Sequence, residues 1–115
     1  MEDSFYRTIH HTDEFDEFYL SLNEKVKSKF DECITILESI YVLNTKFIKK
    51  IVKSELYEMR VSAGANEYRT MIFAVNHNNI IQATEIVLLN GFLKKSTKDY
   101  DKQIKQAIKI LERLR

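Results

Sequence analysis

The sequence predicts an α+β fold, in which an antiparallel β-meander packs against an N-terminal helical hairpin and is followed by a C-terminal helix. Helical periodicity in the first forty residues indicates the hairpin, alternating and apolar runs between residues 56 and 89 indicate the meander, and an amphipathic stripe near the end indicates the last helix. The 115 residues contain no proline, repeat or low-complexity segment. We therefore expect one domain spanning residues 1–115.

The chain is expected to begin with a short strand over residues 5–10, whose side chains alternate in character. Apolar residues then recur every three or four positions, which predicts helices over 13–21 and 24–39. Thr12 or Asp13 suits the N-cap of the first helix, because a short polar side chain can accept hydrogen bonds from free backbone amides.

Ser21 and Glu24 have the spacing of a capping box, which favours a new helix near residue 24 over one continuous rod. The single cysteine, Cys33, lies among the apolar positions of this second helix and is expected to be a core residue.

A lysine-rich segment over residues 46–53 follows and is a candidate short helix. The meander strands are expected over 56–61, 68–75 and 80–89, with turn-forming residues between them. Gly91 is expected to break the third strand, and Asp99 or Asp101 is expected to cap the last helix.

The formal net charge of +1 conceals an asymmetry between two parts of the chain. Residues 1–45 carry four cations and ten anions, whereas residues 46–115 carry fourteen cations and seven anions, so the two parts have charges of −6 and +7. The basic part is suited to an anionic partner. The alternative is that the acidic part folds over the basic part and neutralises it.

Several functional classes lack the residues they need. His10, His11 and Asp13 are the only cluster of metal-ligand types, but neighbouring residues on a strand point to opposite faces, so we expect neither a metal site nor a cofactor. A chain with two glycines has no glycine-rich phosphate loop, and no serine or cysteine nucleophile motif is present.

No apolar run approaches the ~20 residues of a membrane span, and the acidic N-terminus does not resemble a secretory signal. A cytoplasmic protein without membrane contact is therefore expected.

The remaining candidate is a basic cluster. Pairing of the meander strands in sequence order would bring Arg60, Arg69, Lys94 and Lys95 to one edge of the sheet. Such a cluster could hold a phosphodiester and stabilise the negative charge of its transition state. Tyrosines near these positions offer faces on which RNA bases could stack, namely Tyr57, Tyr68 and Tyr100.

Three motifs carry a family resemblance: LYEMRV over 56–61, EYR over 67–69, and LLNGFLKK over 88–95, followed by a helix. Over residues 54–110 this pattern resembles the RelE/ParE toxin superfamily, and within it the phage-derived HigB-like branch, in which LYELR, YR and LxGFxKK segments recur in this order. The resemblance implies a RelE-like sheet faced by a helical hairpin.

The resemblance also implies a function, that of a type II toxin that cleaves mRNA at the ribosome. The nucleophile would be the substrate's own 2′-hydroxyl, so the endoribonuclease would need no metal, and a small helix-turn-helix antitoxin would be its partner. By motif, phosphate binding and transition-state stabilisation would fall to Arg60, Arg69, Lys94 and Lys95, and further RNA contacts to Lys49, Lys50, Lys53 and Lys98.

Proton transfer is less clearly assigned. Glu58 lies beside Arg60, but the resemblance gives it no role. Tyr100 is a candidate catalytic base at a position where relatives often have proline; its phenol, with a pKa of ~10, would need nearby cations to work near neutral pH. The alternative is that Tyr100 only packs at the start of the last helix.

Two other functions stay open. One is a ParE-like toxin that binds gyrase without cutting RNA, and the other is a degenerate toxin that only binds its antitoxin or regulates transcription.

Overall fold

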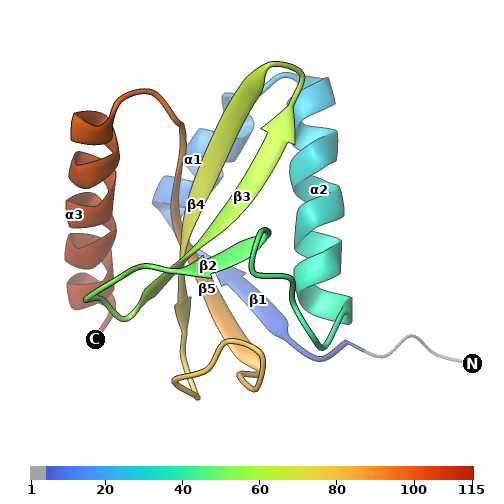
Figure 1. Cartoon of the computed structure of the whole chain (residues 1–115), viewed down its shortest axis with the longest axis vertical. Helices are drawn as coiled ribbons and strands as arrows, with labels where there is room; N and C mark the ends of the chain where they lie inside the picture. Colours follow the sequence, from blue (N-terminus) through green and yellow to red (C-terminus); the bar gives the residue numbers. More distant parts are fainter. Residues whose placement is uncertain (1–4) are drawn as a thin grey trace, which may run out of the picture.

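The computed structural model describes residues 5–115 and contains three helices and a five-stranded mixed sheet (Figure 1). The elements in chain order are β1 (Thr8–His11), α1 (Asp13–Leu20), α2 (Glu24–Ser39), β2 (Ile48–Lys50), β3 (Leu56–Ala63), β4 (Asn66–Ala74), β5 (Glu85–Leu93) and α3 (Thr97–Leu114). The predicted α+β class is confirmed.

The strand order is β1-β5-β4-β3-β2. Strands β3, β4 and β5 form the expected antiparallel meander, and β2 adds antiparallel to β3. The expectation of an antiparallel sheet was incomplete because β1 pairs with β5 in parallel. This pairing joins residues that are far apart in the chain, so no local pattern could indicate it.

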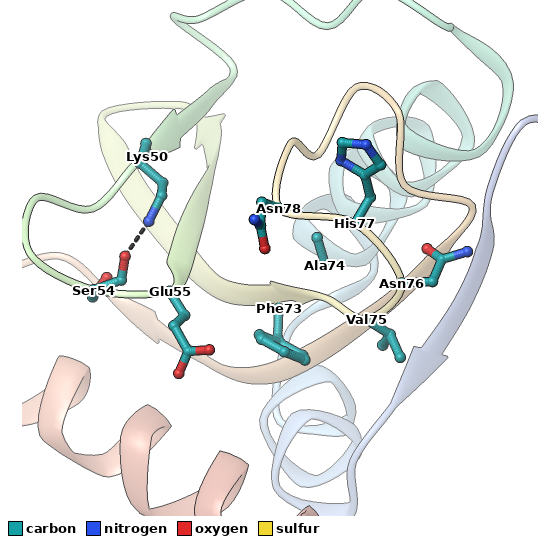
Figure 2. Close-up of a pocket in the computed structure, with 9 residues that line it drawn as sticks. All are labelled: Lys50, Ser54, Glu55, Phe73, Ala74, Val75, Asn76, His77 and Asn78. Carbon is teal, nitrogen blue, oxygen red and sulfur yellow. Dashed lines mark hydrogen bonds between the residues drawn. The ribbon is translucent and has the colours of Figure 1, made fainter.

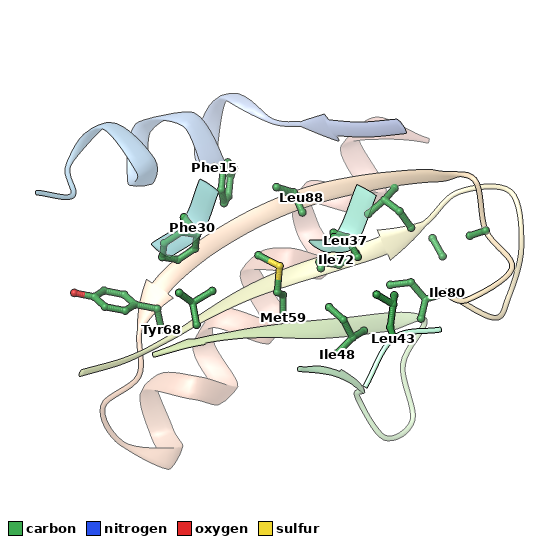
Figure 3. Close-up of a cluster of buried hydrophobic side chains, with 14 of the residues drawn as sticks. Phe15, Phe30, Leu37, Leu43, Ile48, Met59, Tyr68, Ile72, Ile80 and Leu88 are labelled. Atoms are coloured by element: carbon green, nitrogen blue, oxygen red, sulfur yellow. The ribbon is translucent and has the colours of Figure 1, made fainter. Parts of the chain in front are cut away.

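The sheet lies between two helical layers (Figure 1), with α1 and α2 over one face and α3 over the other. Between the hairpin and the sheet, aromatic rings of Phe15, Phe18 and Phe30 pack on one another and on Tyr68 of β4. Figure 3 shows this core, which continues through Met59 and other buried side chains of the strands.

A smaller core lies beneath α3, where alternate residues of the strands face the opposite way. The apolar stripe predicted for the last helix makes this contact through Ala107, Ile110 and Leu111. Alternation along β3 therefore sends Leu56 towards α3 and Met59 towards the hairpin. No helix in residues 5–115 is long and apolar enough to cross a membrane.

The helical hairpin has the predicted bounds, but one of its caps differs. Thr12 caps α1 as expected, since its Oγ1 accepts a hydrogen bond from Phe15 N at 3.1 Å. The capping box was wrong: Asn23 caps α2 by accepting from Val26 N at 3.0 Å, and Ser21 ends α1 instead. Asparagine directly before the helix is as good an N-cap as serine.

The cap of α3 was also misplaced. Helix α3 begins at Thr97, and Ser96 Oγ accepts from the backbone N of Asp99 at 3.1 Å. The predicted caps, Asp99 and Asp101, lie inside the helix. Asp99 falls in its first turn, where an anion favours the helix dipole.

The lysine-rich segment 46–53 forms strand β2 rather than a helix. Ile48 is buried against the core opposite Met59 of β3, while Lys49 and Lys50 are exposed. A short strand at the edge of a sheet needs only one buried anchor, so three residues give little periodicity for a prediction to detect.

Strand β5 begins five residues later than expected and continues through Gly91 to Leu93. The apolar Ile80 is buried, but it lies in the connection before the strand. Gly91 does not break the strand. A Cβ there would lie 2.4 Å from the ring of Phe18, so glycine is needed because α1 approaches the sheet closely.

Candidate functional site

Two arginines lie directly opposite each other on the α3 face of the sheet, because the register of β3 and β4 pairs Arg60 with Arg69. Like charges in this position destabilise a strand pair. Glu58 precedes Arg60 by two residues and therefore projects from the same face of β3. The strand pattern thus supplies a carboxylate beside the two cations.

Glu58 is the centre of the cluster. Its Oε2 accepts a hydrogen bond from Arg60 Nε at 2.7 Å and lies 3.7 Å from Arg69 Nε, while its Oε1 accepts a hydrogen bond from the hydroxyl of Tyr100. The Glu58 side chain is only 4% exposed. We call Glu58, Arg60, Arg69 and Tyr100 the Glu58 cluster.

Helix α3 holds Tyr100 over the sheet. The cap at Ser96 fixes the start of the helix, and Tyr100 lies in its first turns. The ring of Tyr100 packs edge-on against Phe92 of β5 at a centroid distance of 6.1 Å. Tyr100 therefore does pack at the start of the last helix, and this packing directs its hydroxyl to Glu58.

The pKa values of this pair move apart. Burial alone would raise the pKa of the Glu58 carboxyl, but hydrogen bonds from Tyr100 and Arg60 and the charges of the two arginines outweigh it, and the pKa falls below its ordinary value. Burial, the hydrogen bond to Glu58 and its negative charge raise the pKa of the Tyr100 phenol. Near neutral pH, Glu58 is a carboxylate and Tyr100 is a neutral donor.

This arrangement does not favour Tyr100 as a catalytic base. The hypothesis needed cations to lower the pKa of the phenol, whereas the carboxylate next to Tyr100 has the opposite effect and contributes to raising it.

Arg69 is largely enclosed, with a side chain that is 6% exposed. Its Nη1 donates to the carbonyl of Tyr68 at 2.9 Å and to Glu67 Oε1 at 3.3 Å. Its buried Nε has no hydrogen-bond partner among the described residues, and Glu58 is the nearby anion at 3.7 Å. In this conformation Arg69 acts on the site through Glu58.

A cavity of about 250 Å³ opens over the cluster and is lined by Glu58, Arg60, Lys94, Thr97 and Tyr100. Arg60 is one-third exposed and Lys94 is exposed, so both can reach an anion in the cavity. The cavity therefore presents a proton acceptor, a neutral hydroxyl donor and two accessible cations.

Other predicted residues lie outside this cavity. Lys95 and Lys98 are exposed and are not among its lining residues. Lys49 lies opposite Glu58 in the register of β2 and β3, one strand away from the cavity.

Lys50 and Lys53 lie towards the opposite end of β3 from Arg60. Lys50 Nζ donates to the carbonyl of Ser54 and lies 5.5 Å from the ring centroid of Tyr57. Lys53 has a positive φ of 61° in the turn before β3. The structure thus separates these two lysines from the Arg60 and Lys94 side chains.

A second cavity, of about 750 Å³, lies at that other end of the sheet (Figure 2). It is lined by Lys50, Glu55, Phe73 and His77 among others. The turn before β3 and the loop after β4 form two of its walls. Only Lys50 of the predicted site residues contributes to it.

The two adjacent histidines form ion pairs with carboxylates on different elements. His10 pairs with Glu85 and His11 with Asp16, each at 2.6 Å, and no group of three ligand-type side chains capable of holding a metal occurs in residues 5–115. Cys33 packs partly buried against the core, and burial raises the pKa of its thiol.

Sequence reasoning left Glu58 without a role, although a signal was present. A glutamate and an arginine two positions apart on a strand share a face, so Glu58 could be expected beside Arg60. Only the cross-strand register and the position of α3 bring Glu58, Arg69 and Tyr100 together.

Comparison with known families places most of the chain in a family of phage-derived proteins. The model of the family described as phage derived protein Gp49-like (DUF891) matches residues 17–112, from within α1 to the last turn of α3. No curated protein sequence matches the chain. Because the match covers most of the 115 residues, the chain belongs to the Gp49-like phage-derived family of the RelE/ParE-like toxin superfamily, whose members are generally toxins of toxin–antitoxin systems.

Proposed function

We propose that this chain is a HigB-like toxin that cleaves mRNA at the ribosome, through attack of a ribose 2′-hydroxyl on the adjacent phosphodiester. The observation that carries the proposal is the pairing of an ionised Glu58 with a neutral Tyr100 in a cavity that also presents Arg60 and Lys94. Membership of a toxin family and the LYEMR, YR and GFLKK motifs support it.

The reaction requires the protein to fill three catalytic roles. A base takes the proton of the 2′-hydroxyl, an acid protonates the leaving 5′-oxygen, and cations stabilise the charge of the five-coordinate phosphorus. Glu58 is suited to act as the base and Tyr100 as the acid. Arg60 and Lys94 are suited to stabilise the charge of the transition state, because both are accessible from the cavity.

Binding of a phosphate would also tune the base. Arg60 Nε holds Glu58 at 2.7 Å, so a phosphate that takes over Arg60 removes one of the hydrogen bonds that lower the pKa of Glu58. Glu58 then becomes a stronger base when substrate is present. Arg69, which remains behind Glu58, keeps the carboxylate in position.

The substrate supplies the nucleophile in this mechanism, so the proposal requires no metal or cofactor. The proposed partners are mRNA, the ribosome and a small helix-turn-helix antitoxin, all in the cytoplasm.

Incubation of the purified protein with translating ribosomes, followed by mapping of new mRNA 5′ ends, tests the proposal. New ends are expected with the unchanged protein. Arg60→Ala and Lys94→Ala should reduce their formation by roughly 10²-fold, because each removes a cation that stabilises the transition state. Lys25→Ala, an exposed lysine on α2, is the matched control and should retain full activity.

One observation favours a second candidate, a degenerate toxin that only binds its antitoxin. Both arginines already interact with Glu58, and Arg69 is buried, so much of the positive charge at the site is neutralised within the protein. Under this alternative no new mRNA ends form and expression does not arrest growth. Growth arrest without new mRNA ends would instead indicate a gyrase-binding toxin.

A further inference from the structure

Within residues 5–115, the sheet has an unpaired edge at β1. This strand stands at one end of the strand order, and its only partner among the described strands is β5. Thr8 N donates to the carbonyl of Thr84 and Thr12 N to that of Leu88, so the even-numbered residues direct their backbone groups towards β5. The N–H and C=O groups of Ile9 and His11 consequently face outwards, and no hydrogen bond to either N–H occurs within the described part of the chain.

A groove of about 300 Å³ runs beside this edge, between β1, α1 and α2. Its apolar lining comes from all three elements and from β5, namely Ile9, Phe15, Ile34 and Leu88. The side chains of Ile9 and His11 alternate with exposed Thr8 and His10, so a strand added at this edge would direct every second side chain towards the groove.

The rim of the groove is acidic. Asp16, Asp31 and Glu38 line it, and His11 is the only basic side chain among the lining residues. Asp16 pairs with His11 at 2.6 Å and Asp31 accepts from Tyr19 OH at 2.7 Å. The Glu38 carboxylate makes no hydrogen bond or ion pair with the residues that the structure describes.

The negative charge of the rim indicates which kind of partner the groove can bind. A second copy of this chain, paired through its own β1, would bring equivalent acidic rims together, and like charges across an interface are unfavourable. A cationic side chain with an apolar stem fits both the floor and the rim of the groove. The acidic first part of the chain, with its charge of −6, extends the same preference.

We propose that the edge of β1 and its groove bind an extended segment of a partner protein, which adds as a sixth strand and directs alternating apolar and cationic side chains into the groove. The segment's backbone hydrogen bonds with Ile9 and His11 would provide affinity, and the groove would provide specificity. If the chain is a toxin as proposed above, its antitoxin is the expected carrier of this segment. The groove and the Glu58 cluster lie on opposite faces of the sheet, so docking here leaves the cavity beneath Tyr100 uncovered.

The test uses the full-length protein and three short synthetic peptides, which do not depend on RNA cleavage. The first repeats valine, threonine, lysine and threonine, so that valine and lysine alternate on one face of the strand. The second has glutamate in place of lysine, and the third is the lysine peptide with N-methyl groups that block one strand edge. Binding is followed by NMR. We expect the lysine peptide to shift the amide signals of Ile9 and His11 and to slow their hydrogen exchange.

The other two peptides should bind the unchanged protein about tenfold more weakly than the lysine peptide does, because each lacks the charge attraction or the ladder hydrogen bonds. The lysine peptide should also bind about tenfold more weakly to the double variant Asp31→Asn, Glu38→Gln, which lacks two charges of the rim. The matched control, Glu17→Gln with Glu32→Gln, removes the same charge from α1 and α2 outside the groove and should bind normally.

The proposal would be overturned if the control variant lost as much affinity for the lysine peptide as the double variant, or if the N-methylated peptide bound as tightly as the lysine peptide. It would also be overturned if millimolar lysine peptide left the amide signals of Ile9 and His11 unshifted. Protection of the Ile9 and His11 amides by self-association in the absence of peptide would also overturn it. Loss of mRNA cleavage with peptide binding intact would overturn the proposed function alone.

Discussion

The hydroxyl of Tyr100 on α3 donates a hydrogen bond to the carboxylate of Glu58 on β3, and this contact joins the last helix to the middle of the sheet. The two residues are 42 positions apart in the chain. The contact fixes the protonation of both groups, because it lowers the pKa of Glu58 and raises that of Tyr100. The state of one group can therefore be probed by changing the other.

Tyr100→Phe should separate the chemical role of Tyr100 from its packing role. The ring contact with Phe92 is retained, but Glu58 loses a hydrogen-bond donor. A hydrogen bond to a charged group contributes about 1.5–3 kcal/mol, so urea unfolding should show a loss in that range. If Tyr100 is the proton donor, RNA cleavage should also fall by about 10²-fold.

The matched variant is Tyr57→Phe, which also removes a tyrosine hydroxyl, here one that donates to the carbonyl of Asn78. A comparable loss of cleavage in Tyr57→Phe would show that reduced stability, and not the chemistry at Tyr100, explains the result.

Glu58→Gln should make the stability of the protein less dependent on pH. The folded pKa of Glu58 is depressed, so its contribution to stability is fully present above the unfolded pKa of about 4.3 and is lost as pH falls through the folded pKa. At pH 7 the variant should be less stable by about 3 kcal/mol, because two arginines lose their carboxylate. Urea unfolding at pH 7, 5 and 3 measures the difference.

The difference in unfolding free energy between the unchanged protein and Glu58→Gln should narrow as the pH falls from about 5 towards 3, because protonated Glu58 resembles glutamine. A gap that stays constant over this range would mean that the ionisation of Glu58 does not stabilise the fold.

Gly91→Ala should be costly although Gly91 lies inside a strand, where alanine would ordinarily be tolerated. The new Cβ would lie 2.4 Å from ring atoms of Phe18, so α1 or β5 must shift. Overpacking of this kind destabilises proteins by about 1–3 kcal/mol, which thermal or urea unfolding would detect.

Adding Phe18→Leu should restore part of that loss, because it removes the ring that the Cβ meets. In a double-mutant cycle the two changes should therefore be non-additive. Strict additivity would contradict the close approach of Phe18 to Gly91.

Gly91 also illustrates which parts of the fold the sequence could reveal. Helical periodicity gave the bounds of α1 and α2 to within one residue, and Thr12 was one of two residues predicted to cap α1, because these signals are contained within one or two turns. The same local reasoning interpreted Gly91 as a strand break. Its actual cause, the ring of Phe18, comes from an element more than seventy residues away.

The candidate site, too, could be predicted only in part from the sequence. The motifs predicted Arg60, Arg69 and Lys94 as site residues, and the β3–β4–β5 meander brings their strands together as expected. They could not reveal that Arg69 is buried or that Tyr100 reaches Glu58, because both depend on how α3 packs across the sheet. The pairing of β1 with β5 was missed for the same reason, since it depends on tertiary contact alone.

The last prediction concerns Arg7, a buried arginine that has no carboxylate partner within residues 5–115. Its guanidinium, in a residue that is 2% exposed, donates to the carbonyls of Leu37 in the last turn of α2, of Ile40 and Tyr41 just after that helix, and of Ile80 and Ile81 before β5. Burial lowers the pKa of Arg7, and the carbonyl dipoles at the C-terminal end of α2 favour its positive charge. Arg7 thereby ties three segments of the chain together.

Arg7→Lys should therefore be strongly destabilising although it conserves charge, because an ammonium group has three donors and cannot satisfy five separated carbonyls. We expect a loss of about 3–5 kcal/mol in urea unfolding, as for a buried charge that loses its partners. Arg113→Lys, the matched change at an exposed arginine that pairs with Glu14, should have a much smaller effect. Similar losses in both variants would mean that the five carbonyl contacts do not stabilise the fold.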